Sequence, residues 1–210
     1  MSSRLRIGID FDNTLVTYDD VFRSAARSRG LIDEGFSGTK QAVRDRIRLL
    51  PDGEIAWRTL QGHVYGKGID DAVMFEGADT FLTRCRAEGC SVFVVSHKTE
   101  FGHYDPAKVN LRRAALDWMA ARGFFRADGY GIPIENVFFE GTRDDKVARV
   151  SDLKCTHFID DLEEVLIDPK FPSGITRILF SEAGRQAAAS PYLVRPTWRE
   201  IEESVFDGRA

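Results

Sequence analysis

Five short apolar runs, each ending at a polar residue, constrain the fold of this chain more than any other feature of its sequence. They lie at residues 5–9, 91–95, 137–139, 157–159 and 175–180, and Val, Ile and Phe dominate them. Runs of this length and composition are typical of strands buried on both faces of a sheet. Helical patterns lie between them, so we expect an α/β fold, a Rossmann-like parallel sheet flanked by helices.

Two of these helices have clear sequence signals at their ends. Asp105-Pro106 is expected to begin a helix in the middle of the chain, because proline favours the first helical position. The pattern Thr197-x-x-Glu200 is a capping box, which predicts the start of the last helix.

The segment between the first and second predicted strands is longer than a crossover helix requires, at roughly 75 residues. Its middle carries apolar residues at helical spacing. We therefore expect residues 18–73 to form a small helical insertion, and residues 1–17 together with 74–210 to form the α/β core.

Charge and cysteine content restrict the partners and the compartment. Lys and Arg number 29 against 33 Asp and Glu, for a formal net charge of −4, so no global field favours nucleic acid. No apolar run approaches the ~18 residues that span a bilayer, and charges come too early at the amino terminus for a signal peptide. Cys85, Cys90 and Cys155 form no C-x-x-C pattern and are expected to be reduced structural thiols. We expect a soluble, cytoplasmic protein without membrane partners, and the sequence does not indicate its oligomeric state.

Polar residues gather where the predicted strands end, and parallel sheets bind their ligands at that edge. In chain order they are Asp10 and Asp12, Ser96, Lys146, and the pair Asp160–Asp161. Taken singly, they are also compatible with an Asx turn, a capping serine and a surface lysine. Two adjacent acids at a buried strand end, however, repel each other unless a cation or a donor lies between them.

Taken together and in this order, these groups resemble the four motifs of the haloacid dehalogenase superfamily of phosphotransferases. The matching segments are Asp10-Phe11-Asp12-Asn13-Thr14-Leu15, Val94-Val95-Ser96, Lys146 and Ile159-Asp160-Asp161. The resemblance extends from about Leu5 to Phe180, and the insertion stands where family members carry a cap of the first type. Asn13 stands where many members have glycine, but asparagine also tolerates left-handed backbone angles.

The resemblance implies a Mg²⁺-dependent phosphatase that hydrolyses a small phosphorylated metabolite, of the sugar phosphate or nucleotide class, through an aspartyl-phosphate. Asp10 is implied as the nucleophile, and Asp12 as the general acid and then base. The implied Mg²⁺ ligands are Asp10, Asp12 through its backbone carbonyl, and Asp160 or Asp161. The implied phosphate-binding residues are Ser96, Lys146, Thr14 and His97.

Three basic residues are candidate substrate contacts, namely Lys98, Arg44 and Arg48. Arg44 and Arg48 share a helix face at i,i+4 spacing and could attract an anionic substrate, but a solvated helix face is the alternative. In the superfamily, an acid two residues after the nucleophile accompanies phosphate-ester chemistry, and dehalogenases typically lack it. A phosphomutase or phosphotransferase of the family would share every motif. A catalytically idle binding domain is a third interpretation, against which the complete motif set argues.

Overall fold

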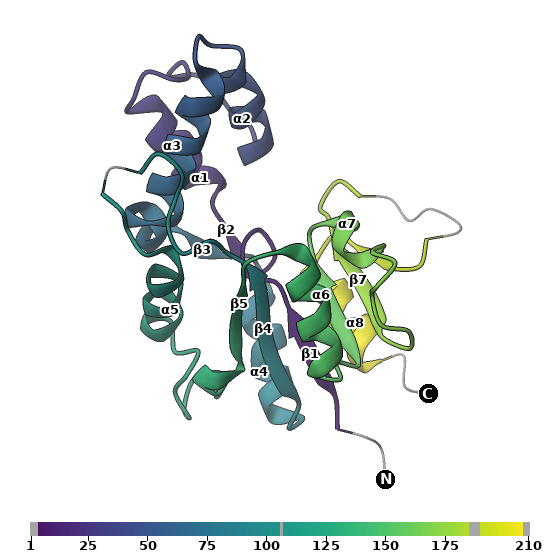
Figure 1. The fold of residues 1–210 in the computed structure, drawn as a ribbon. Helices are drawn as coiled ribbons and strands as arrows, with labels where there is room; N and C mark the ends of the chain where they lie inside the picture. Colours follow the sequence, from purple (N-terminus) through teal and green to yellow (C-terminus); the bar gives the residue numbers. More distant parts are fainter. Residues whose placement is uncertain (1–3, 106, 185–189, 208–210) are drawn as a thin grey trace. The chain divides into compact units, whose positions relative to one another are not determined.

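The computed structural model describes residues 4–105, 107–184 and 190–207, in which six strands form one parallel sheet (Figure 1). Their order across the sheet is β5-β4-β1-β6-β7-β8. The strands are β1 (Arg6–Ile9), β4 (Ser91–His97), β5 (Val137–Glu140), β6 (His157–Asp160), β7 (Thr176–Phe180) and β8 (Leu193–Arg195). The predicted Rossmann-like α/β fold is confirmed, and β8 is a strand that the apolar runs did not predict.

Strand β1 lies in the middle of the sheet, between β4 and β6. Ile9 is in register with Val94 on one side and with Ile159 on the other. The chain leaves β1 for β4 on one side and later returns to β6 on the opposite side, so the strand order reverses at β1. The carboxyl end of β1 is therefore the switch point at which parallel sheets bind ligands.

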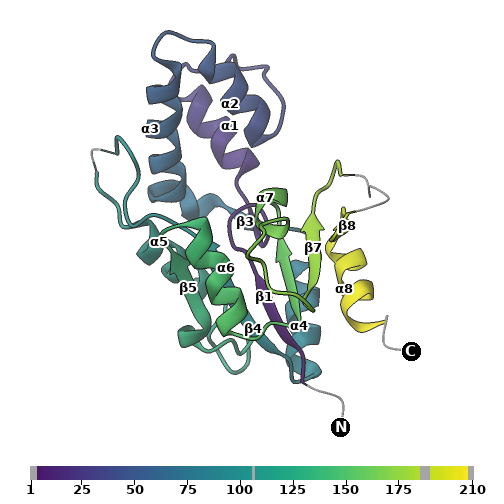
Figure 2. The same ribbon diagram turned by 45° about the vertical axis from the view of Figure 1, so that its right-hand side comes forward.

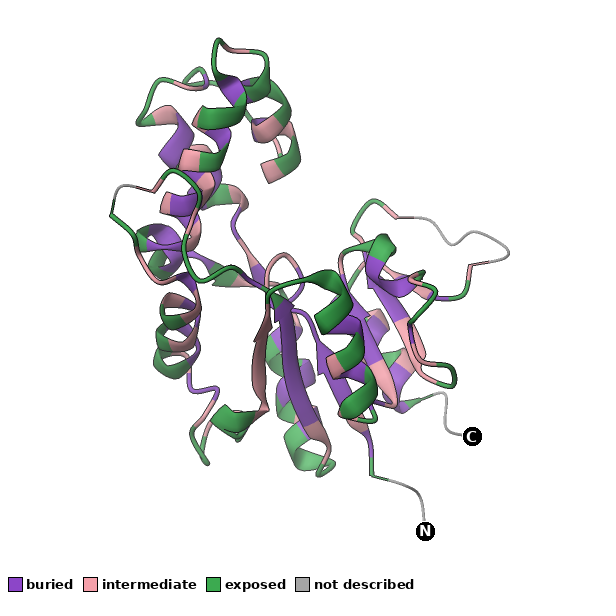
Figure 3. Ribbon diagram, in the orientation of Figure 1, coloured by how far each residue is buried: buried purple, intermediate pink, exposed green. Residues whose placement is uncertain are grey.

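Helices cover both faces of the sheet (Figures 1 and 2). They are α4 (Ala78–Ala87), α6 (Arg143–Asp152), α7 (Glu163–Leu166) and α8 (Trp198–Phe206), with a 3-10 turn, η2 (Ile134–Asn136). Helices α6 and α7 share one buried cluster with β4, β6 and β7, whereas α4 and α8 pack on each other through Phe81 and Trp198, whose ring centroids lie 5.1 Å apart. Strands β1, β4 and β6 are largely buried between these two layers, as the apolar runs predict, whereas β5 is only partly buried along its whole length (Figure 3).

The chain divides into two compact units, and the second consists of residues 17–73 and 98–122. Its helices are α1 (Asp19–Arg27), α2 (Lys40–Arg48), α3 (Gly53–Tyr65), η1 (Lys67–Asp71) and α5 (Leu111–Ala121). Phe22 stacks on Trp57 at 5.0 Å, and the Trp118 indole donates to the Ala72 carbonyl at 3.1 Å. The expected helical insertion is thus joined in its core by α5, which the sequence prediction assigned to the α/β part. A separate two-stranded sheet comprises β2 (Val16–Thr17) and β3 (Val73–Met74).

Helix α5 begins later than the sequence predicts. Asp105 accepts from the Ala107 and Val109 N–H groups, at 3.0 and 3.1 Å, in a turn that precedes the helix. Asn110 is the N-cap and accepts from the Arg113 N–H at 2.9 Å. The predicted start at Asp105-Pro106 was wrong because Asp105 caps a local turn instead; Pro106 itself lies outside the described residues. The described ranges contain no helix with both the length and the apolar character needed to cross a bilayer.

Candidate active site

Asp10 is held at the carboxyl end of β1, where its backbone and side chain are both fixed. Its N–H donates to the Ile159 carbonyl at 2.9 Å, which extends the pairing of β1 with β6 by one residue. The residue is 4% exposed. One carboxylate oxygen, Oδ1, accepts from the Lys146 ammonium at 2.6 Å, and the other lies 3.4 Å from the Thr14 hydroxyl, which donates to it. The predicted nucleophile is therefore buried, oriented and next to a cation.

Lys146 forms ion pairs with two carboxylates, one directly after β1 and one at the end of β6. Its Nζ lies 2.6 Å from Asp10 Oδ1 and 2.6 Å from Asp160 Oδ2, and the residue is 1% exposed. Burial by itself lowers the pKa of Lys146, but Asp10 and Asp160 outweigh it and hold that pKa above its ordinary value. Lys146 is therefore a buried cation at neutral pH, and its charge offsets those of the two acids.

Asp160 and Asp161 follow each other at the end of β6 but differ in environment. Asp160 is fully buried, and its Oδ1 accepts from the Leu162 N–H at 3.0 Å. Burial raises the pKa of Asp160 to about 6, in spite of the opposing charge of Lys146. Asp161 is half-buried, and its Oδ1 lies 3.5 Å from the Thr14 hydroxyl oxygen.

Three carboxylates converge at this edge in a set that fits a hard divalent cation. Asp10, Asp160 and Asp161 each present an oxygen, and these oxygens lie within 4.8 Å of one another. An all-oxygen set of this kind suits Mg²⁺, which takes few protein ligands and keeps several waters. This carboxylate cluster does not include the Asp12 side chain, and the expected metal contact of the Asp12 backbone carbonyl stays a prediction.

Two further residues support the site, and the prediction did not include them. Thr142 is the N-cap of α6, the helix that carries Lys146; its hydroxyl accepts from the Asp145 N–H at 3.1 Å and donates to the Asp145 carboxylate at 2.7 Å. The spacing Thr142-x-x-Asp145 is a capping pattern that could have been recognised in the sequence. Trp198, on α8, donates to the Thr14 carbonyl at 3.1 Å and so fixes the loop after β1. Such a long-range contact leaves no local sequence signal.

The loop after β1 contains a left-handed backbone conformation at Asn13, which this residue type tolerates. Asn13 has a φ of 61°, in the left-handed region that asparagine tolerates. Its N–H donates to the Val16 carbonyl at 2.8 Å, which closes the turn at the start of β2.

Ser96 and His97 lie at the carboxyl end of β4. Ser96 is 1% exposed. Its strand extends beyond Val94, which is in register with Ile9, so Ser96 lies at the same edge of the sheet as Asp10. His97 is exposed, and its Nε2 lies 3.0 Å from the Gly141 carbonyl in the loop before α6. His97 thus contacts the chain itself, and its predicted phosphate contact stays a prediction.

The predicted substrate-binding residues Lys98, Arg44 and Arg48 all lie in the second unit. Lys98 is 4% exposed, and its Nζ lies 4.9 Å from the centre of the Tyr65 ring. Arg44 pairs with Asp45 at 2.9 Å and Arg48 with Glu54 at 2.7 Å. Each of the two arginines therefore has a carboxylate partner on its own unit, and their role toward a substrate stays a prediction.

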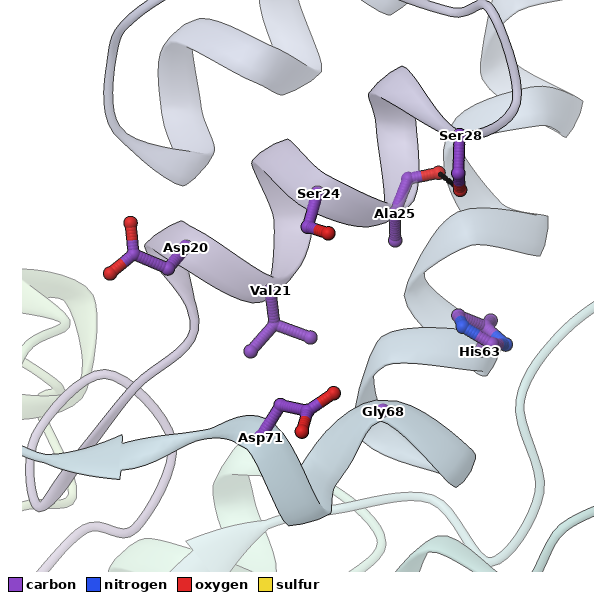
Figure 4. Close-up of a pocket in the computed structure, with 8 residues that line it drawn as sticks. All are labelled: Asp20, Val21, Ser24, Ala25, Ser28, His63, Gly68 and Asp71. Atoms are coloured by element: carbon purple, nitrogen blue, oxygen red, sulfur yellow. Dashed lines mark hydrogen bonds between the residues drawn. The ribbon is translucent and has the colours of Figure 1, made fainter.

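A cavity of about 320 Å³ lies within the second unit (Figure 4). Residues of α1, α3 and η1 line it, among them Asp20, His63 and Asp71. Burial, together with Arg29, lowers the pKa of His63, so this imidazole is mostly neutral at pH 7. None of the predicted catalytic residues lines this cavity.

The fold and this site define an α/β protein with a lysine-neutralised carboxylate cluster at the switch point of its sheet. No protein-family model matches the sequence, and no curated protein matches it either. Solved structures do match over nearly the whole chain. A haloacid dehalogenase-like family hydrolase from Streptococcus pneumoniae is similar with a TM-score of 0.62 at 13% identity, over 98% of this chain and 100% of that one.

Two other similar structures carry more specific descriptions. A haloacid dehalogenase family hydrolase from Deinococcus radiodurans, with bound phosphate and sodium, matches with a TM-score of 0.58 at 16% identity, over 99% of this chain and 97% of that one. A predicted phosphoglycolate phosphatase from Haemophilus somnus matches with a TM-score of 0.56 at 13% identity, over 98% of this chain and 99% of that one. A dehalogenase is also among the similar structures, with a TM-score of 0.53. The chain thus has the haloacid dehalogenase-like fold that its motifs suggested.

Proposed function

We propose that this protein is a Mg²⁺-dependent phosphatase that hydrolyses a small phosphomonoester, of the sugar phosphate or nucleotide class, through an aspartyl-phosphate on Asp10. The observation that carries the proposal is the Lys146 ammonium, buried 2.6 Å from both Asp10 and Asp160 at the switch point of the sheet. Phosphoryl transfer requires an in-line nucleophile and neutralisation of charge, and the proposal assigns these roles to Asp10 and to Lys146.

The chain's own residues account for two chemical steps. Asp10 attacks phosphorus, and a bond from its carboxylate to phosphorus forms as the bond to the leaving oxygen breaks. Asp12 gives that oxygen a proton. Asp12 then takes a proton from a water molecule, which attacks the phosphoryl group, releases inorganic phosphate and restores Asp10. Lys146 lowers the repulsion between the Asp10 carboxylate and the anionic phosphoryl oxygens, and buried Ser96 is proposed to bind one of those oxygens.

The proposed cofactor is Mg²⁺, held by Asp10, by Asp161 or Asp160, and by the backbone carbonyl of Asp12. Support comes from the three carboxylate oxygens that lie within 4.8 Å of one another. When bound, the ion neutralises charge on the phosphoryl group. Among the similar structures, the hydrolase from Deinococcus radiodurans has phosphate and sodium bound, which is compatible with an anion and a cation in a protein of this fold.

Three alternatives share the fold. A phosphomutase or phosphotransferase would use the same groups but pass the phosphoryl group to a second hydroxyl instead of water. A dehalogenase is among the similar structures, but the presence of Asp12 favours phosphate-ester chemistry. A catalytically idle binding domain is disfavoured because the nucleophile, the lysine and the metal-type carboxylates are all present and mutually oriented.

The deciding experiment compares wild type with Asp10→Asn on a panel of phosphorylated metabolites in the presence of Mg²⁺. We expect at least one compound to release inorganic phosphate, and Asp10→Asn to reduce that rate at least about 1,000-fold with the circular dichroism spectrum unchanged. Asp152→Asn, an exposed acid at the end of α6, is the matched control and should behave as wild type. Equal rates for Asp10→Asn and wild type would overturn the assignment of the nucleophile. Transfer of phosphate to a second hydroxyl would instead identify a mutase.

A further inference from the structure

Cys85 and Cys90 lie in the turn that links α4 to the amino end of β4, at the end of this strand remote from Ser96. The Cys90 N–H donates to the Cys85 carbonyl at 2.8 Å, and the Gly89 N–H donates to the Arg86 carbonyl at 3.0 Å. Gly89 has a φ of 64°, in the left-handed region. With Glu88 as the C-cap, these bonds define a Schellman motif in which Cys85 precedes the cap by three residues and Cys90 follows it by two.

This motif brings the side chains at those two positions into contact, and in most helices the contact is apolar. Here both positions are cysteines, and their side chains hydrogen-bond to each other. The backbone hydrogen bond between the same two residues also keeps their α-carbons close, which disulfide geometry requires. The local chain path therefore holds the two cysteines side by side.

The two thiols differ in their exposure. Cys85 is buried, whereas Cys90 is partly exposed and lines a surface pocket of about 310 Å³. Arg4 and Arg86 line the same pocket, and each donates to a neutral backbone carbonyl. Cationic groups beside a partly exposed thiol attract anionic reagents to it. Cys90 is therefore the thiol that a small anionic oxidant can reach.

We propose that Cys85 and Cys90 form a reversible dithiol–disulfide pair that is oxidised by low-molecular-weight disulfides. The Cys90 thiolate attacks the reagent's disulfide, forms a mixed disulfide and releases one equivalent of the reagent's thiol. Cys85 loses its proton to solvent and attacks the Cys90 sulfur, so that the Cys85–Cys90 bond forms as the mixed disulfide breaks and the second equivalent leaves. Two thiols of the chain are oxidised, and one reagent disulfide is reduced to two thiols.

The environment of Cys85 supports this order of events. The hydrogen bond with Cys90, together with burial, raises the pKa of the Cys85 thiol well above its ordinary value, so Cys85 is a poor first nucleophile. Modification of Cys90 converts its thiol to a disulfide sulfur, which alters that hydrogen bond. Cys85 then ionises more easily and resolves the mixed disulfide.

Cys155 provides the control within the same chain. It is buried in the cluster on the α6 and α7 face of the sheet, and burial raises its pKa to about 11. It should therefore react with neither the reagent nor the pair.

The test incubates the full chain with defined ratios of oxidised to reduced glutathione, followed by acid quenching, alkylation of free thiols and peptide mapping by mass spectrometry. Wild type and Cys155→Ser should each lose two hydrogens and yield a linked peptide that joins Cys85 to Cys90, and dithiothreitol should reverse the change. Cys85→Ser and Cys85→Ala should stop at a glutathione adduct on Cys90. Cys90→Ser should remain unmodified.

Two results would overturn the proposal. One is wild-type protein that accumulates the glutathione adduct on Cys90 with no linked peptide, because the two thiols then do not reach each other. The other is a linked peptide that contains Cys155. Circular dichroism of each variant shows that it is folded, and Cys85→Ala keeps the comparison valid if a buried serine disturbs the turn.

Discussion

At the scale of single residues, Lys146 determines the electrostatics of the site. A lysine in a sequence is nearly always a solvated surface group, yet this one is 1% exposed between two carboxylates. Its charge offsets the cost of placing Asp10 and Asp160 in a low-dielectric interior. The three side chains therefore act as one unit, in which the loss of any member leaves the others imperfectly compensated.

Replacement of Lys146 by methionine keeps much of the side chain's length but removes its charge. We expect the free energy of unfolding to fall by about 3–5 kcal/mol, because two carboxylates remain buried without their cation. Urea denaturation at neutral pH measures the change. Lys170→Met is the control, since Lys170 pairs with Asp144 on the exposed surface, and it should leave stability nearly unchanged. Equal stability of the two variants would show that Lys146 is not the counter-ion of the site.

Asp160 and Asp161, the adjacent acids at the end of β6, are expected to have different roles. Both oxygens of Asp160 already have partners in the chain, Lys146 and the Leu162 N–H, so Asp161 is expected to be the more direct ligand of Mg²⁺. Asp161→Asn should weaken Mg²⁺ binding at least about ten-fold, as measured by calorimetric titration of the free protein. Asp160→Asn should chiefly reduce stability in the absence of metal. An Asp161→Asn protein that binds Mg²⁺ like wild type would reverse these assignments.

The residues at the strand ends were foreseeable from the sequence, and several of their contacts were not. Asp10, Ser96 and Asp160 end apolar runs, and a parallel sheet necessarily brings such ends to one edge. Lys146 could be placed only through the resemblance, because its burial depends on where α6 packs. The contact from Trp198 to the Thr14 carbonyl joins residues 184 positions apart, a separation that no local pattern reveals.

At the scale of elements, the first turn of α6 positions Lys146. Thr142 and Asp145 satisfy each other's hydrogen-bonding groups at the start of this helix. Thr142→Ala should lower the free energy of unfolding by about 1 kcal/mol in urea denaturation, as is usual for the loss of an N-cap. Thr142→Ser keeps the hydroxyl and should be close to wild type. If the alanine and serine variants were equally stable, the cap would not contribute.

Strand β8 and the start of α5 were not predicted correctly from the sequence, and each case has a physical reason. Strand β8 is only three residues long, lies at the edge of the sheet and is followed by Pro196, so it lacks the extended apolar run that marks the buried strands. The start of α5 was misplaced because Asp105 caps a turn of its own. Residues with strong capping chemistry mark turns as well as helix starts, and the sequence alone does not separate the two.

At the scale of the whole molecule, the second unit is assembled from two separate stretches of chain. Helix α5 buries Leu111, Ala115, Trp118 and Met119, and it contacts α3 and η1 within that unit. The Arg122 guanidinium adds a hydrogen bond to the Ala72 carbonyl at 2.9 Å. The insertion that the sequence marks out, residues 18–73, is therefore not a self-contained piece.

Deletion of residues 18–73, with a short Gly-Ser linker in their place, tests this point. We expect the shortened protein to bind an apolar fluorescent dye and to self-associate on size-exclusion chromatography, because α5 loses the surface against which Trp118 packs. A matched deletion that also removes residues 98–122 should bind less dye. A monomeric, dye-free product from the first deletion would mean that α5 does not need the insertion.

The chain passes between the two units four times, after residues 16, 73, 97 and 122. These four crossings restrict which segments can be exchanged between related proteins to make a chimera. A gene segment that encodes residues 18–73 cannot be exchanged for a foreign one as a single cassette, because the incoming helices would meet an α5 shaped for different neighbours. A successful chimera must replace two stretches together, with α5 drawn from the same parent as α3.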